Sequence, residues 1–251
     1  MGDSMDQTTY AFILATLAGL STLLGTIFIF FPIKKKNTIL ITSLSFAAGV
    51  MLTVSFSDLI PTSIISLKRT FYMIPSILIT MISFVIGIIL SMTIDQKMPD
   101  QQNHLKRVGL IAMLAIILHN IPEGIATYLT SSNNMKLGIT LTIAIALHNI
   151  PEGISISIPI YYATKNKFRA FLYTLISGLS EPFGAVIAAL FLSQWITPWM
   201  MGILYAIIAG IMTHIALYEL LPTSWKYHQI KKTISFFIIG VIVMLLSHIL
   251  I

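Results

Sequence analysis

The residues His-Asn-Ile-Pro-Glu-Gly occur twice in the chain, at His119–Gly124 and again at His148–Gly153. A helix turns by about 100° per residue, so His119 lies at about 0°, Glu123 at about 40° and Asn120 at about 100°. The three side chains therefore share one face. Imidazole nitrogen, carboxylate oxygen and amide oxygen form a ligand set that suits zinc or ferrous iron. Each copy of the motif thus indicates a metal-binding face.

The proline and glycine of the motif point to a site inside a membrane. Pro122 and Pro151 have no N–H, so the carbonyl one turn earlier loses its helical partner and must find another one within the bilayer. Gly124 and Gly153 allow a second backbone to approach closely. One copy could be a proline-kinked helix, but two copies 29 residues apart favour a shared site. Facing helices would bring together six ligands for a two-metal cluster bridged by carboxylates: His119, Asn120, Glu123, His148, Asn149 and Glu152.

The composition identifies an integral membrane protein. Of the 251 residues, 56% are hydrophobic and only 10% are charged, whereas a soluble domain has about 25% charged residues. The chain has no cysteine, which excludes disulfides and thiolate metal sites. The acidic start, with Asp3 and Asp6, does not resemble a signal peptide.

We expect an all-α polytopic membrane protein with a single transmembrane domain over residues 1–251. Eight apolar segments are long enough to span a bilayer, at about 10–32, 39–66, 71–94, 108–130, 137–162, 169–195, 198–222 and 233–251. Twelve of the 15 Lys and Arg residues fall in or beside the odd-numbered connections. The positive-inside rule then predicts cytoplasmic odd-numbered loops and two extracytoplasmic termini. Because the basic residues serve to orient the chain, we expect no nucleic-acid binding.

A second, weaker repeat relates the second and seventh predicted spans. Ala48–Met51 resembles Ala209–Met212, and Asp58–Ser63 resembles Glu219–Ser224, both at an offset of 161 residues. These spans are five helices apart, and an odd separation inverts their orientation across the membrane. The two motif helices are neighbours and are therefore also inverted. The sequence thus predicts a 3+2+3 arrangement with inverted repeats, which is typical of secondary transporters with a site near the bilayer midplane.

The acidic residues give independent support for a cation. All four glutamates lie inside predicted spans, and no Lys or Arg lies well inside a span to pair with them. Burying a charged side chain there costs roughly 2.5–3.5 kcal/mol on insertion scales, so a bound cation is the simplest counterion. Glu181 precedes Pro182 in the sixth span. Asp58 is predicted toward the outer mouth and Glu219 toward the inner mouth, with an ordinary helix-end polar group as the alternative for both.

The chain resembles the ZIP family of zinc and iron-type divalent metal transporters over essentially its whole length. The resemblance rests on the eight spans, both motif copies, Ser45–Pro61, Ser177–Gly184 and Ala209–Pro222. It implies metal uptake through a binuclear centre, with the metal as substrate and no cofactor. One site would use His119, Glu123, His148 and Glu152, with the Met51 thioether; the other would use Asn120, Glu123, Asn149, Glu152 and Glu181. Two departures are Tyr218-Glu219, where relatives often have Asp-Glu, and a third loop without a His-rich run.

The expected function is uptake of Zn²⁺ across a prokaryotic plasma membrane into the cytoplasm, with Fe²⁺, Mn²⁺, Co²⁺ and Cd²⁺ as further candidates. Asp58 would gather the cation, and Glu219 with His214 would receive it. For His214, a hydrogen-bonded helix histidine is the alternative. The main competing function is a membrane-embedded metal-dependent hydrolase, against which the missing H-E-x-x-H motif and the inverted duplication argue. A membrane metal sensor is a third reading, and a homodimer is left open.

Overall fold

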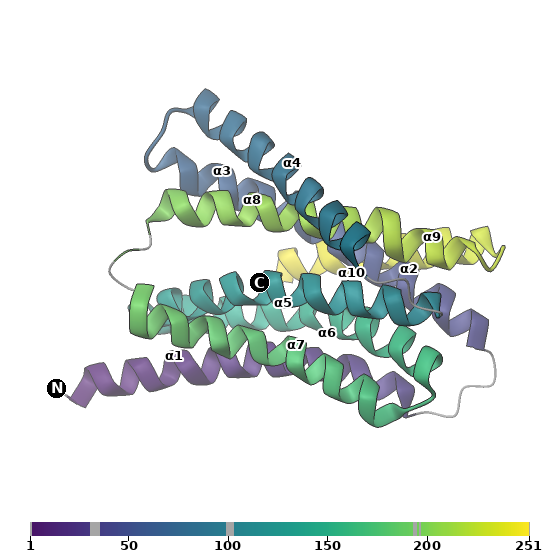
Figure 1. The fold of residues 1–251 in the computed structure, drawn as a ribbon. Helices are drawn as coiled ribbons and strands as arrows, with labels where there is room; N and C mark the ends of the chain where they lie inside the picture. Colours follow the sequence, from purple (N-terminus) through teal and green to yellow (C-terminus); the bar gives the residue numbers. More distant parts are fainter. Residues whose placement is uncertain (1, 31–35, 99–102, 193–194, 196, 251) are drawn as a thin grey trace.

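The computed structural model describes all residues except 1, 31–35, 99–102, 193–194, 196 and 251. Within these limits every element is a helix, and no strand occurs (Figure 1). Eight helical runs are long and apolar enough to cross a membrane, which confirms the predicted all-α class and the eight spans. The elements are α1 (Gly2–Ser21), η1 (Thr22–Ile29), α2 (Lys36–Val54), η2 (Ser55–Leu59), α3 (Ile60–Lys68), α4 (Met73–Lys97), α5 (His104–Asn133), α6 (Met135–Thr164), α7 (Lys167–Ile187), η3 (Ala188–Leu192), α8 (Pro198–His214), η4 (Ile215–Leu220), α9 (Leu221–Trp225) and α10 (Ile230–Leu250).

Several helices extend by a few residues beyond the apolar segments of the sequence. The motif helices α5 and α6 have 30 residues each and are separated by Asn134 alone. Asparagine side chains cap both helices: Asn103 accepts from the N–H of Leu105, and Asn134 accepts from the N–H of Leu137. Polar first turns of this kind carry no hydropathy signal. One consequence is that Arg107 lies on α5 and not in a loop.

Three of the spans contain a π-helical segment, in η2, η3 and η4. In η2 the N–H of Ile60 donates to the carbonyl of Ser55, and in η4 the N–H of Leu221 donates to the carbonyl of Ala216, in each case five residues back. Pro61 and Pro222 come two residues after the end of η2 and of η4, and neither can donate a backbone hydrogen bond. The turns hold Asp58 and Glu219, and π-turns are frequent at functional sites.

The helices form two groups. In the first, α1, η1, α5, α6 and α7 pack around one another; in the second, α2 packs mainly with α10, and α8 packs with α4 and α3 (Figure 1). The largest contact between the groups is that of α2 with α6. In α4 and α10 only 22% of the apolar segment is buried inside the protein, so most of each of these helices lies on the outside of the bundle. The motif helices therefore lie inside a bundle, against its contact with a second group.

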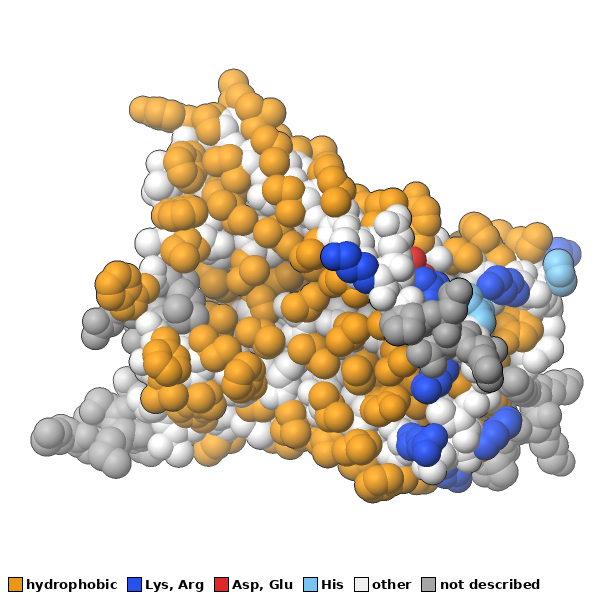
Figure 2. Space-filling model, in the orientation of Figure 1, with side chains coloured by type: hydrophobic (Ala, Val, Ile, Leu, Met, Phe, Trp, Pro, Cys, Tyr) orange, Lys and Arg blue, Asp and Glu red, His pale blue; other side chains and the backbone are white. Residues whose placement is uncertain are grey.

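Basic side chains gather at one end of the molecule, and the rest of the visible face is predominantly hydrophobic (Figure 2). This end, which we call the lysine-rich end, is where α2, α5, α7 and α10 begin (Figure 1). A large apolar core cluster contains residues near these helix starts, including Leu40 and Leu44 of α2 and Leu105 of α5.

Candidate metal centre

The two motif copies face each other across the antiparallel α5 and α6. His148 Nε2 lies 3.0 Å from Glu123 Oε1, and His119 Nε2 lies 3.2 Å from the same oxygen. His119 Nε2 is also 3.4 Å from Glu152 Oε1. The ligand atoms of His119, Glu123 and His148 all lie within 4.8 Å of one another. The cluster thus has two imidazoles on one carboxylate oxygen, with a second carboxylate beside them.

The motif asparagines turn toward the neighbouring helices. Asn120 Nδ2 donates to the carbonyl of Ser177 on α7 at 3.1 Å, and Asn149 Nδ2 donates to the carbonyl of Ala18 on α1 at 3.0 Å. Asn149 Nδ2 also donates to Glu181 Oε2 at 2.9 Å. The α7 carboxylate is therefore joined to the motif cluster through Asn149.

The motif glycines permit this close arrangement. A Cβ added at Gly124 would lie 1.8 Å from the carbonyl oxygen of Glu181, and one at Gly153 would lie 1.9 Å from the carbonyl oxygen of Thr22. No side chain fits at such distances. The predicted close approach of another backbone is confirmed: α7 crosses α5 at Gly124, and η1 crosses α6 at Gly153.

The side chains of the cluster are buried, and many of their oxygen and nitrogen atoms have no hydrogen-bond partner. His119, Asn120, His148, Asn149, Glu152 and Glu181 are at most 2% exposed, and Glu123 is 6% exposed. Among the described residues, the buried side-chain oxygens that lack a hydrogen-bond partner include both of Glu152, one each of Glu123 and Glu181, and both asparagine Oδ1 atoms. The Nδ1 atoms of His119 and His148 also lack a hydrogen-bond partner among the described residues. Buried polar atoms are normally paired, and charged ones need a partner or a metal. The arrangement can coordinate a divalent cation.

A cavity lies beside this cluster. It has a volume of about 110 Å³, and its lining includes Glu123, His148 and Asp58. A second cavity of about 450 Å³ is lined by residues at the ends of α3, α5 and α8, among them Arg69, Asn133 and Pro198. Both cavities are lined by Thr62, Ala126 and Tyr205, so they adjoin at these residues, which we call the neck.

Asp58 and Met51, two further residues predicted to contact the metal, lie in different surroundings. Asp58 lines the smaller cavity beside the cluster, and Thr62 Oγ1 donates to its Oδ1 at 3.4 Å. Met51 is fully buried, and it belongs to the apolar core cluster together with Ile116 and Met212.

Two predicted transport-path residues have partners outside the cluster. His214 Nδ1 is 2.9 Å from Ser91 Oγ, and its ring stacks on Tyr218, as in the hydrogen-bonded alternative. Glu219 Oε1 lies 3.9 Å from Arg107 Nη1. Arg107 lies in the first turn of α5, at the end of a span and not well inside it, and from there it reaches Glu219.

Two polar residues, Arg107 and Thr22, have contacts in the structure that no pattern in the sequence indicated. Arg107 also pairs with Asp95 at 2.6 Å and so joins α5 to the end of α4. Thr22 is fully buried, and its Oγ1 has no hydrogen-bond partner in the part of the chain that the structure covers. It lies against the backbones of Gly153 and Gly178. A lone threonine in an apolar run cannot be distinguished from packing, although Thr22 precedes Glu181 by the same 159 residues that separate Ala18 from Ser177.

The fold and this cluster define a class: a multi-pass helical membrane protein with a buried His/Glu/Asn centre. The family model "ZIP Zinc transporter" matches residues 96–248. The chain belongs to the ZIP family of zinc transporters, as the motif resemblance implied. Membership favours a transporter over the membrane-embedded hydrolase.

Full-length relatives agree with this assignment. The chain is 39% identical to the zinc transporter ZupT of Clostridium perfringens, an alignment that covers 98% of this chain and 97% of the relative. It is 40% identical to the zinc transporter ZupT of Chlorobium phaeovibrioides, with 94% and 96% covered. The zinc transporter ZupT of Campylobacter jejuni is 36% identical, with 97% of each chain covered.

Proposed function

We propose that this protein takes up Zn²⁺ across the bacterial plasma membrane into the cytoplasm. The observation that carries the proposal is the buried cluster of His119, Glu123 and His148, whose ligand atoms lie within 4.8 Å of one another. Burying these carboxylates without a cation is unfavourable, and a zinc ion would take up their unused oxygens. The named relatives are zinc transporters. In this proposal the metal is the substrate and not a resident cofactor.

We assign two adjacent metal sites to the cluster. One takes the imidazoles of His119 and His148 with the carboxylates of Glu123 and Glu152, with Met51 as a further candidate. The other takes Asn120, Asn149 and Glu181 together with the same two carboxylates. The hydrogen bonds support this division, because each asparagine uses its Nδ2 as a donor and keeps Oδ1 without a hydrogen bond. The mixed nitrogen and oxygen ligands suit zinc and also Fe²⁺, Mn²⁺, Co²⁺ or Cd²⁺.

Matching local features support the proposed 3+2+3 inverted repeat. The π-turn bonds start at Ile60 and Leu221, which are equivalent at the offset of 161 residues. The asparagine acceptors Ala18 and Ser177 lie on the first and sixth spans, which the repeat would equate. The repeat equates the second span with the seventh and the third with the eighth. In the second group the second span packs on the eighth, and its equivalent, the seventh, packs on the third.

The direction of transport follows from the proposed sidedness. If the lysine-rich end is cytoplasmic, both termini are extracytoplasmic and the two cavities open to the outside. Zinc would then pass Arg69 and the neck at Tyr205, meet Asp58, and reach the cluster. At the other end, Glu219 beside Arg107 and Asp95 would be the last acid before the cytoplasm.

Zinc uptake into liposomes that hold the purified protein tests this function. The wild-type chain should carry zinc with no organic substrate present. Glu123→Gln should reduce the initial rate by at least about 100-fold, because it removes the charge that faces both imidazoles. Thr93→Val, at a partly exposed position of α4, should transport normally. Normal uptake by Glu123→Gln would refute the assignment.

A further inference from the structure

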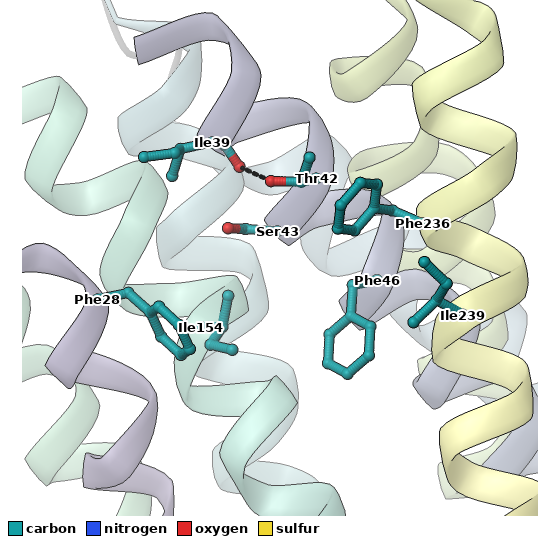
Figure 3. A pocket seen from close by; sticks show the side chains of 8 residues that line it. All are labelled: Phe28, Ile39, Thr42, Ser43, Phe46, Ile154, Phe236 and Ile239. Atoms are coloured by element: carbon teal, nitrogen blue, oxygen red, sulfur yellow. Dashed lines mark hydrogen bonds between the residues drawn. The ribbon is translucent and has the colours of Figure 1, made fainter. Parts of the chain in front are cut away.

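An apolar groove lies at the boundary between the two helix groups, and no predicted metal ligand lines it. Its volume is about 270 Å³. Phe28 and Ile154 line it from η1 and α6, and Phe46 with Phe236 lines it from α2 and α10 (Figure 3). Ile39, Thr42, Ser43 and Ile239 complete the lining. The Thr42 hydroxyl donates to the carbonyl of Ile39 at 3.2 Å, so its proton is already used within its own helix. The groove is therefore suited to hydrocarbon.

The position of the groove relates it to the basic surface. Its two α10 residues and three of its four α2 residues belong to the first halves of those helices, which begin at the lysine-rich end. On α10, Lys232, Phe236 and Ile239 have i, i+4, i+7 spacing and share one face. Lys232 thus stands one turn, about 6 Å, above the groove. An elongated molecule can place hydrocarbon in the groove and a negative charge at this level.

The surface above the groove is cationic. Lys231 and Lys232 are exposed and line a surface hollow of about 420 Å³ together with His228, Gln229 and Ile230. On the other helix group, Lys167 Nζ lies 5.2 Å above the ring centre of Phe30, two residues beyond Phe28. Basic residues therefore stand at the same end on both groups.

We propose that this groove binds one acyl chain of an anionic glycerophospholipid whose phosphate contacts Lys231 and Lys232. Charge complementarity selects the anionic headgroup, since a lysine near the membrane surface favours anionic lipid. The groove walls come from both helix groups, so the lipid contacts α6 and η1 on one side and α2 and α10 on the other. This site is independent of the proposed metal transport.

Quenching by brominated lipid tests the site in nanodiscs of equal phosphatidylglycerol and phosphatidylcholine. The native Trp195, Trp199 and Trp225 are replaced by Phe, and Phe236→Trp reports the groove. Bromine on phosphatidylglycerol should quench Phe236→Trp more strongly than bromine on phosphatidylcholine. Ile242→Trp, exposed on another face of α10, is the matched control and should show no preference.

Neutralising the two lysines decides the proposal. Adding Lys231→Gln and Lys232→Gln to the Phe236→Trp protein should reduce its preference for phosphatidylglycerol on the order of tenfold. Equal quenching by the two lipids at Phe236→Trp, or a preference that survives the lysine changes, would overturn the proposal. Native mass spectrometry of the chain with all its tryptophans gives a second readout. There the double Gln variant should lose the retained phosphatidylglycerol, and equal retention counts against the site.

Discussion

Replacing Glu152 by glutamine should make the metal-free protein more stable while it weakens zinc binding. Glu152 is fully buried, and neither of its oxygens has a hydrogen bond among the described residues. His119 Nε2 approaches its Oε1 to 3.4 Å. Glutamine has nearly the same shape but no charge. If Glu152 stabilises the fold, its replacement by glutamine should lower the stability of the metal-free chain. If Glu152 binds a cation, the same replacement should raise that stability.

The expected magnitude follows from the burial of the carboxylate. A charged side chain at a helix centre costs roughly 2.5–3.5 kcal/mol, and the amide recovers part of it, about 1–2 kcal/mol. For a chain of this length each kcal/mol shifts the melting temperature by about 2–4 °C, so the gain is roughly 2–8 °C. Loss of a metal ligand should weaken zinc binding by at least ~100-fold, or about 2.8 kcal/mol.

Thermal unfolding followed by tryptophan fluorescence, with chelator or with excess zinc, measures both effects. Zinc should raise the melting temperature of the wild-type protein strongly and that of Glu152→Gln only weakly. Glu123→Gln is the matched comparison. Because two imidazoles face the Glu123 carboxylate, its removal should stabilise the metal-free protein less. A lower melting temperature of Glu152→Gln in chelator, with zinc stabilisation retained, would refute the reasoning.

Two further variants test other parts of the molecule. Arg107→Gln removes the ion pair that joins α5 to α4; since both partners are about a quarter exposed, we expect a loss of about 1 kcal/mol and a melting temperature roughly 2–4 °C lower. Lys136→Gln, on an exposed position, should unfold like the wild type, and equal melting of the two variants would contradict the role of Arg107. Ala126→Phe fills the neck between the two cavities and should slow uptake more than tenfold without weakening equilibrium zinc binding. Ile139→Phe on the outer surface of α6 is its control, and undiminished uptake by Ala126→Phe would exclude this route.

The duplicated motif made much of this arrangement predictable from the sequence. The helical angles of His119, Glu123 and Asn120, together with the short connection 131–136 between the predicted spans, predict that the two copies face one another. Apolar length alone predicts the eight spans. These signals are strong because a membrane restricts the backbone to helices and makes buried charge rare.

Other features depend on tertiary contacts and have no local signature. The polar start of α5 hid the helical position of Arg107, and with it the contacts to Asp95 and Glu219. The unpaired hydroxyl of Thr22 becomes visible only where η1 meets the backbones of α6 and α7. His214 is buried, as a metal ligand would be, but its hydrogen-bond partner is Ser91 on α4, which the sequence around His214 does not reveal.

Zinc K-edge X-ray absorption on the purified, zinc-loaded protein tests the central claim most directly. The account predicts two zinc ions per chain with nitrogen and oxygen ligands and with imidazole scattering. This scattering should be lost when His119 and His148 are both replaced by alanine. Absence of bound zinc, or a spectrum that the double replacement leaves unchanged, would contradict it.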